Sequence, residues 1–215
     1  MRSIQSLTIQ SYPASEPVSL SDMKLFLKRD DTDDDSYISA LITCARQRAE
    51  SYVNRCLVTT TFDMRLDGFP NNQALLSNRA FFGQLAPDGS LYIPRPPLQS
   101  VSYIQYLDTN NVQQTLDPSQ YVVDIYREPA RVALAPGVTA WPDTYETVNA
   151  VTVRFIAGYD GVTRICPQTI LQAIRMMVGA FYEERTPVQH ALSRDLPKIV
   201  RAEGLLWNDK VVEFR

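Results

Sequence analysis

Few side chains of the kinds that carry catalysis occur in the sequence. His190 is the only histidine, and a lone exposed histidine more often plays no catalytic part. Glu183 and Glu184 are neighbours, so on a helix they point from different faces and make a poor acid–base pair. The sequence has no GxxxxGK[ST] or GxGxxG phosphate-binding motif and no GxSxG nucleophile turn. These observations predict a protein that is not an enzyme and that uses no cofactor.

The acidic stretch DDTDDDS at residues 30–36 is the densest group of possible metal ligands. A calcium loop that began at Asp31 would place Ser36 where the turn glycine belongs and Ile42 where a bidentate glutamate is required. Acidic residues at the start of a helix also interact favourably with the helix dipole. The stretch therefore predicts a solvated helix start and no metal site.

The charge balance is not typical of a nucleic-acid-binding protein. The 215 residues include 21 basic and 24 acidic side chains, for a net charge of -3, so a global positive field that would gather phosphates is missing. No apolar run approaches the length of a membrane span, and no secretion signal is evident. Cys44, Cys56 and Cys166 form no CxxC pair, which favours free thiols. We expect a protein that is made in the cytosol and that DNA would pass without being bound.

The elements that must position any functional surface begin with helices at both ends of the chain. Residues 18–55 predict two helices, the second over 36–54. A further helix of about five turns is predicted over 168–185, between Pro167 and Pro187. Each of the two long helices has an apolar stripe, so we expect them to pack on one another. The residues expected in their shared core are Leu41, Ile42, Ile174, Val178 and Phe181.

Residues 57–160 have the period of strands instead. The run TTTFDMRLD alternates apolar and polar side chains, as a half-buried strand does. Later runs, VSYIQYLD, YVVDIY, RVALA and VNAVTVRFIAGY, are rich in β-branched and aromatic residues and are separated by turn-forming residues. Residues 68–90 are predicted to form a long excursion between the first two strands. The pattern indicates a compact antiparallel sheet or small barrel.

The sequence therefore predicts an α+β fold in which helices from both ends of the chain form one bundle, with an antiparallel β domain inserted between them in the sequence. The expected divisions are an N-terminal helical part at 1–56, the β domain at 57–160, a C-terminal helical part at 161–206 and a C-terminal tail at 207–215.

The order of these elements resembles a known family. The chain has, in sequence, the stretches PVSLSDMKLFL, SYVNR, TTTFDMRLDGFP, IPRPPLQSVSYIQYLD, YVVD, VRFIAGYDG and QAIRMMVGAFYEER. Together they are similar to the head-to-tail connector proteins of tailed bacteriophages, also called adaptor or head-completion proteins, over nearly the whole chain. Each stretch is a structural signature, and it is their order that carries the resemblance.

The resemblance implies a structural protein of the virion, located at the head–tail junction and made in the cytoplasm of the host bacterium. It implies a homo-oligomeric ring, twelve-fold like the portal, that sits beneath the portal protein and binds downstream tail or head-completion proteins. DNA would pass through the channel of this ring without sequence-specific binding. Two other hypotheses stay open at this point, a small hydrolase that uses carboxylates from the β domain and a nucleic-acid-binding module.

The C-terminal segment LLWNDKVVEFR is too short to form a core of its own. It is apolar enough to dock into a neighbouring connector subunit or the portal, and its alternating end can add as a strand to a sheet edge. Docking on its own helices is the alternative. The residues expected to make the contact are Leu205, Leu206, Trp207, Val211, Val212 and Phe214.

Overall fold

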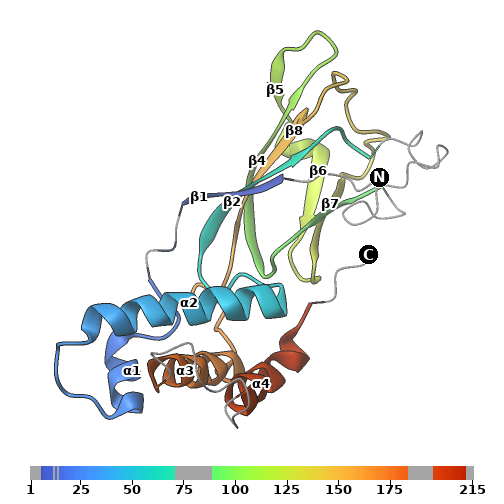
Figure 1. Ribbon diagram of the computed structural model, residues 1–215. Helices are drawn as coiled ribbons and strands as arrows, with labels where there is room; N and C mark the ends of the chain where they lie inside the picture. Colours follow the sequence, from blue (N-terminus) through green and yellow to red (C-terminus); the bar gives the residue numbers. More distant parts are fainter. Residues whose placement is uncertain (1–5, 12, 14, 71–88, 184–195, 212–215) are drawn as a thin grey trace. The chain divides into compact units, whose positions relative to one another are not determined.

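The computed structural model (Figure 1) describes residues 6–11, 13, 15–70, 89–183 and 196–211. The chain divides into two compact units. We call them the sheet unit, which comprises residues 1–12, 59–158 and 212–215, and the helical unit, which comprises residues 13–58 and 159–211. Among the described residues, no helix is long and apolar enough to cross a membrane.

Individual residues at the helix ends determine where the helices of the helical unit begin and end. Ser19 caps the first helix, because its hydroxyl accepts a hydrogen bond from the backbone N–H of Asp22 at 3.0 Å. Asn54 takes the left-handed conformation, with φ of 58°, and ends the second. Pro167 precedes the third, where its missing N–H leaves no donor unpaired. The helices are α1 (Leu20–Leu27), α2 (Asp35–Val53), α3 (Gln168–Glu183), α4 (Leu196–Leu206) and the short η2 (Trp207–Asp209).

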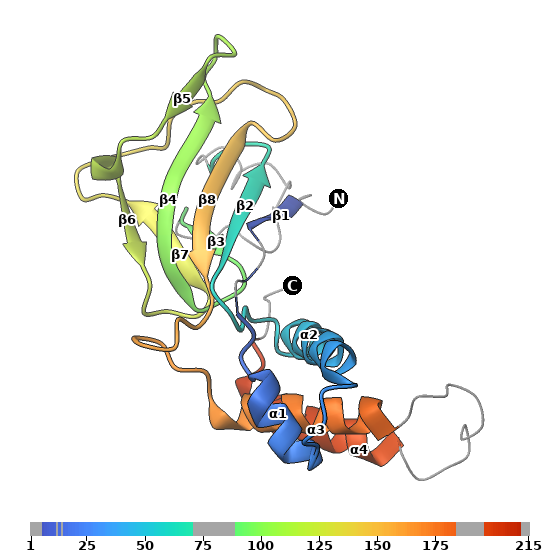
Figure 2. The ribbon, with the colours of Figure 1, turned by 90° about the vertical axis from the view of Figure 1, so that its left-hand side faces the viewer.

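One apolar core holds these helices together. The α3 helix contacts α1, α2 and α4, and in Figure 2 it lies between α1 and α4. Alanines at Ala45, Ala49, Ala173 and Ala202 have no exposed surface, so the helix backbones approach closely. The larger fully buried side chains around them include Met23, Ile170, Ile174, Met177 and Leu206.

The sheet unit contains two antiparallel sheets. The five-stranded sheet has the order β1 (Ser6–Ser11), β2 (Thr60–Leu66), β8 (Val151–Ala157), β4 (Leu98–Leu107) and β5 (Gln113–Thr115). The three-stranded sheet has the order β3 (Leu91–Ile93), β7 (Ala130–Leu134) and β6 (Tyr121–Asp124), with the short helix η1 (Pro118–Gln120) before β6. Figure 2 shows this smaller sheet behind the larger one.

Alternation of side chains decides which face of each strand is buried. On β8, Val151, Val153, Phe155 and Ala157 are all buried, and the residues between them are partly exposed. Phe62 on β2 lies opposite Phe155 in the ladder, and their rings stack with centroids 5.4 Å apart. The five-stranded sheet therefore has a buried apolar face.

On the other face of this strand pair, an ion pair satisfies a buried carboxylate. Asp63 accepts hydrogen bonds from Nε and Nη2 of Arg154, at 2.7 and 2.8 Å, and the guanidinium carbon lies 5.0 Å from the ring centroid of Tyr103. The bidentate geometry pairs both carboxylate oxygens, which is what a carboxyl group with only 5% of its surface exposed requires.

The α+β fold class is as predicted from the sequence, but the N-terminal boundary was wrong in one respect. Residues 1–56 were all assigned to the N-terminal helical part, whereas Ser6–Ser11 form β1, which pairs with β2 in the sheet unit. The sequence SLTIQS does alternate, with Leu7 and Ile9 as its apolar residues, but the run is short, and the strand lies at the edge of its sheet with four of its residues exposed. The expected excursion at 68–90 falls mostly outside the described residues, as do His190 and Glu184.

Candidate partner-binding surfaces

The acidic stretch before α2 serves structural contacts. Asp35 accepts from Nζ of Lys24 at 2.7 Å, and Asp34 accepts a hydrogen bond from the hydroxyl of Tyr182. No group of three or more His, Cys, Asp or Glu side chains suited to a metal ion occurs among the described residues. The geometry therefore fits a helix start that ties α1 and α3 to the beginning of α2.

The five residues expected in the shared core all lie in the helical unit. Ile42, Ile174 and Val178 are buried in its core cluster, and Leu41 and Phe181 are partly buried against that cluster. These residues come from α2 and α3, which are more than a hundred positions apart in the sequence. Three of the five therefore belong to the buried core, and the other two lie at its margin.

The segment expected to dock on a partner is divided between core and surface. Leu206 has no exposed surface and belongs to the core of the helical unit, so the expectation that it is a docking residue was wrong. The helical turn of α4 points it inward, which the apolar string Leu205, Leu206 and Trp207 alone does not reveal. Trp207, in contrast, is 68% exposed, and Leu205 is also exposed.

Residues 209–211 are held on the helical unit by three hydrogen bonds. Nε of Arg55 donates to the backbone carbonyl of Asp209 at 2.7 Å, and the hydroxyl of Thr169 donates to the Asp209 carboxylate at 2.9 Å. The backbone N–H of Val211 donates to the carbonyl of Val53 at 2.9 Å. These hydrogen bonds hold the chain beside the end of α2 as far as Val211. Val212 and Phe214 lie outside the described residues.

A cation and an aromatic ring are exposed side by side at this point. Nζ of Lys210 lies 5.9 Å from the ring centroid of Trp207 and 5.2 Å from that of Tyr52 on α2. Such cation–π contacts orient the side chains without burying them. Arg48 lies one helical turn before Tyr52 on α2, and its Nη2 donates to Glu203 on α4 at 2.7 Å. We call Arg48, Leu205, Trp207 and Lys210 the cationic patch.

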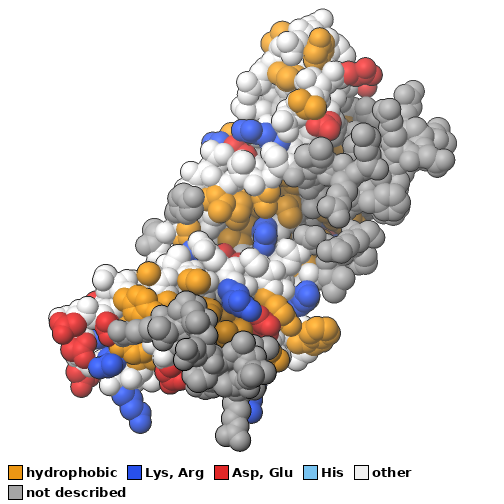
Figure 3. All heavy atoms as spheres, viewed as in Figure 1, with side chains coloured by type: hydrophobic (Ala, Val, Ile, Leu, Met, Phe, Trp, Pro, Cys, Tyr) orange, Lys and Arg blue, Asp and Glu red, His pale blue; other side chains and the backbone are white. Residues whose placement is uncertain are grey.

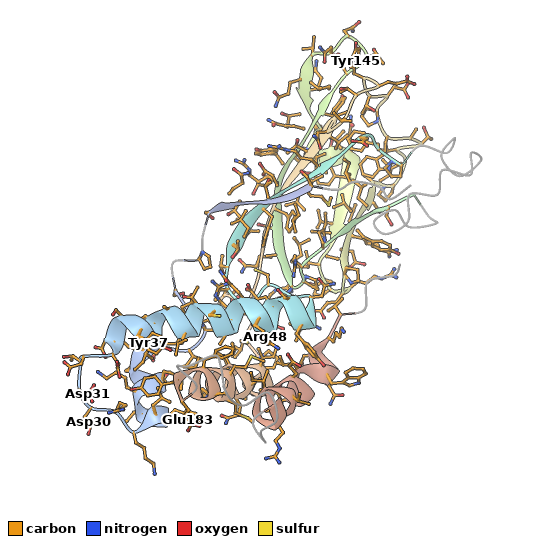
Figure 4. The ribbon with its side chains drawn as sticks, in the orientation of Figure 1. Asp30, Asp31, Tyr37, Arg48, Tyr145 and Glu183 are labelled. Atoms are coloured by element: carbon orange, nitrogen blue, oxygen red, sulfur yellow. The ribbon has the colours of Figure 1, made fainter. Side chains whose placement is uncertain are left out.

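A second exposed apolar group lies at the other end of α2, and the sequence did not single it out. Leu25 is 76% exposed on α1, and Phe26 of the same helix and Tyr37 in the first turn of α2 are also exposed. Figure 4 shows Tyr37 at the same end of the helical unit as Asp30 and Asp31, with Arg48 further along α2. We call Leu25, Phe26, Asp30, Asp31 and Tyr37 the acidic patch. In the sequence, Leu25, Phe26 and Tyr37 stand among charged residues, which could have indicated exposure. Helical spacing alone, however, does not distinguish an exposed apolar face from a buried one.

The sheet unit also exposes apolar side chains. Tyr145, which is labelled in Figure 4, lies at one end of this unit, and its backbone N–H donates to the carbonyl of Leu107 at 3.0 Å. Val148 and Val112 are exposed as well. These residues come from the β4–β5 turn and from the segment before β8, so exposed apolar side chains occur at this end of the unit.

Burial keeps the thiol at the base of α3 unreactive. Desolvation raises the pKa of Cys166 to about 12, with a smaller rise from the charge of Asp209 that is opposed by Arg55. A thiol with such a pKa is protonated at neutral pH and is a poor nucleophile. Cys56 is also buried, and its Sγ donates to the carbonyl of Val58. Neither cysteine resembles a catalytic nucleophile.

The chain is similar to a known protein family. The family model described as "Phage gp6-like head-tail connector protein" matches residues 17–125. That range begins before α1 and ends after β6, so it takes in parts of both units. No curated protein gave a match.

Solved structures share the fold over nearly the full length. A chain from the neck of an empty gene transfer agent (GTA) particle, computed with C6 symmetry, has a TM-score of 0.68 and 16% identity, and the match covers 97% of this chain and 96% of that one. A chain from the neck of a native GTA particle, computed with C12 symmetry, has a TM-score of 0.65 and 16% identity over the same shares. A chain from the virion of the native particle has a TM-score of 0.68 and 15% identity, covering 96% of each. At these identities the likeness establishes a common fold.

Proposed function

Because the chain belongs to the phage gp6-like head-tail connector family, we propose that it is a structural protein of the virion that joins the DNA-filled head to the tail. The observation that carries this proposal is the family match over 17–125, which includes α1, α2 and the strands β2 to β6. The likeness to neck proteins of GTA particles over 97% of the chain supports the same location. Neither a carboxylate-based hydrolase nor a nucleic-acid-binding module gains support from these comparisons.

The protein assembles as a closed ring in this proposal. The necks of the similar particles were computed with C6 and C12 symmetry, which supports a ring whose symmetry is twelve-fold or a divisor of twelve. Such a ring forms by a heterologous contact, in which one surface of a subunit meets a different surface of the next. The ring sits beneath the portal protein and surrounds the channel through which DNA leaves the head.

The chain's own parts take the following roles. The helices from both ends of the chain form one bundle, and residues 57–160 form the inserted domain. The C-terminal tail at 207–215 is the docking arm toward a neighbouring connector subunit or the portal, with Trp207 and Phe214 as its aromatic anchors. Two observations support this role: Trp207 is exposed, and a backbone hydrogen bond to Val53 holds Val211 at the end of α2. The protein acts by binding and not by catalysis.

Imaging of assembled particles tests the proposal. We expect symmetry averaging to place this chain as a ring at the head–tail junction, between the portal and the tail. A particle in which the chain is a single copy on the axis, or a repeat of the capsid shell, would overturn the connector assignment.

A further inference from the structure

The helical unit carries two exposed apolar surfaces with charges of opposite sign. They are the acidic patch, beside the α1–α2 turn, and the cationic patch, where α2 and α4 end. Figure 3 shows acidic side chains gathered over the α1–α2 turn. Between residues 28 and 35, five aspartates stand against two basic residues. Both patches belong to the same compact unit, so their separation is fixed by the helix that joins them.

That separation suits a contact between copies. The α2 helix has 19 residues and spans about 28 Å. Asp35 begins α2 next to the acidic patch, and Tyr52 near its end touches Lys210 of the cationic patch. A surface at each end of a rigid helix is the arrangement that a heterologous, ring-forming contact uses.

Charge decides which surfaces can meet. If two copies joined through the same patch, aspartates would face aspartates, or Lys210 would face Lys210, and like charges at an interface repel. If the cationic patch of one copy meets the acidic patch of the next, opposite charges meet and the apolar residues of both patches are covered together. Trp207 is the largest exposed side chain of the cationic patch, and buried tryptophan at an interface carries much of the binding energy.

From this complementarity we infer that Trp207 and Lys210 of one subunit bind the acidic end, Leu25 to Tyr37, of a second copy of the same chain. This inference rests on the proposed ring and names the two surfaces that close it. Arg48 and Lys210 lie toward Asp30 and Asp31 of the second copy, and Trp207 packs on its Leu25, Phe26 and Tyr37.

Charge reversal with mutual rescue tests this contact in assembled particles. Asp30→Lys/Asp31→Lys makes both patches positive, and Arg48→Glu/Lys210→Glu makes both negative. Each variant produced alone should lower the amount of the chain in particles at least about tenfold, since like charges then meet at every contact. Produced together, the two variants should restore incorporation, because they can alternate around a ring with an even number of subunits.

A matched control separates this effect from a general change of charge. Asp143→Lys/Glu146→Lys reverses two exposed carboxylates in the sheet unit and should leave incorporation unchanged. Thermal melting of each purified variant should match the wild-type protein within a few degrees, since all four reversed side chains lie at the surface and the ion pairs that are lost, Arg48 with Glu203 and Asp31 with Arg29, are partly exposed and contribute little.

The possible outcomes separate this inference from the connector assignment. Normal incorporation of either reversal variant alone, or loss of incorporation that the mixture does not restore, would overturn the contact and leave the connector role standing. Absence of a ring of the wild-type chain from the particle would overturn the connector role itself, and with it the contact.

Discussion

Nε of Arg46 on α2 lies 2.6 Å from the Glu16 carboxylate, and Nη1 of the same side chain lies 2.8 Å from Glu50. Only 8% of the Arg46 side chain is exposed. Glu16 also accepts from the Thr43 hydroxyl at 2.9 Å, and Glu50 accepts from the backbone N–H of Leu57 at 2.9 Å. One guanidinium therefore ties the segment before α1 and the segment after α2 to the middle of α2.

Arg46→Ala should lower the free energy of unfolding by about 2 kcal/mol, because it leaves two carboxylates without their cation. The loss stays below that for a fully buried pair, since Glu16 and Glu50 retain some exposure to solvent. Arg48→Ala is the control on the same helix. Its ion pair with Glu203 is exposed, so the loss there should be under about 1 kcal/mol. Equal losses for both variants in chemical unfolding would contradict the structural role of Arg46.

Ile174→Asp should unfold the helical unit or make the protein insoluble. Ile174 has no exposed surface, and a charge placed there has no partner in the apolar core around it. The expected loss exceeds about 4 kcal/mol, in the range reserved for buried unpaired charges. Gln172→Asp, at an exposed position two residues earlier on α3, should remain soluble with a nearly normal melting temperature. Ile174→Asp protein that melts like the wild type would mean that this face of α3 is not part of a core.

The three cysteines should differ in how fast they react with a thiol reagent. Cys44 is exposed, and Cys56 and Cys166 are buried. Because the pKa of Cys166 is raised to about 12, its reactive thiolate is rare below that pH and becomes common only as the pH approaches it. With a thiol reagent at pH 8, we expect one fast-reacting thiol per folded chain and three after denaturation. Cys44→Ser should abolish the fast reaction, and a fast reaction that persists in this variant would show that a second thiol is accessible.

The long elements were predictable because burial repeats with the helix or strand period. The helix expected over 36–54 is α2 (Asp35–Val53), and the one expected over 168–185 is α3 (Gln168–Glu183). The stripe through Ile174 and Val178 marks the buried face because residues four apart lie on one side of a helix.

Other features depend on contacts between residues that are far apart in the sequence. The β1 strand is held by pairing with β2, more than fifty residues away, and its edge position leaves most of its side chains exposed. Leu206 is apolar like its neighbours Leu205 and Trp207, and only the packing of α4 separates the buried residue from the exposed ones. The sequence thus indicated that the C-terminal segment is apolar enough to make contacts. It did not indicate which of the side chains are exposed, because tertiary packing determines that.

Two truncations should separate the structural part of the C-terminal segment from its docking part. Removal of 208–215 deletes the hydrogen bonds of Asp209 and Val211 to Arg55, Thr169 and Val53. Three hydrogen bonds of about 1 kcal/mol each, offset in part by the freedom that the chain end regains, should lower the free energy of unfolding by about 2 kcal/mol.

Removal of 212–215 alone retains those hydrogen bonds, so the purified protein should melt within about 2 °C of the wild type. If the C-terminal tail is the docking arm, particles made with this shorter truncation should still fill with DNA but should fail to retain it or to accept tails, and packaged DNA and tail attachment measure each step. The longer truncation, which also removes the Lys210 contact with Trp207, should give the same particle defect together with reduced stability. Fully infectious particles made with the 212–215 deletion would show that the last four residues take no part in docking, and would confine the contact to Trp207, Lys210 and their neighbours.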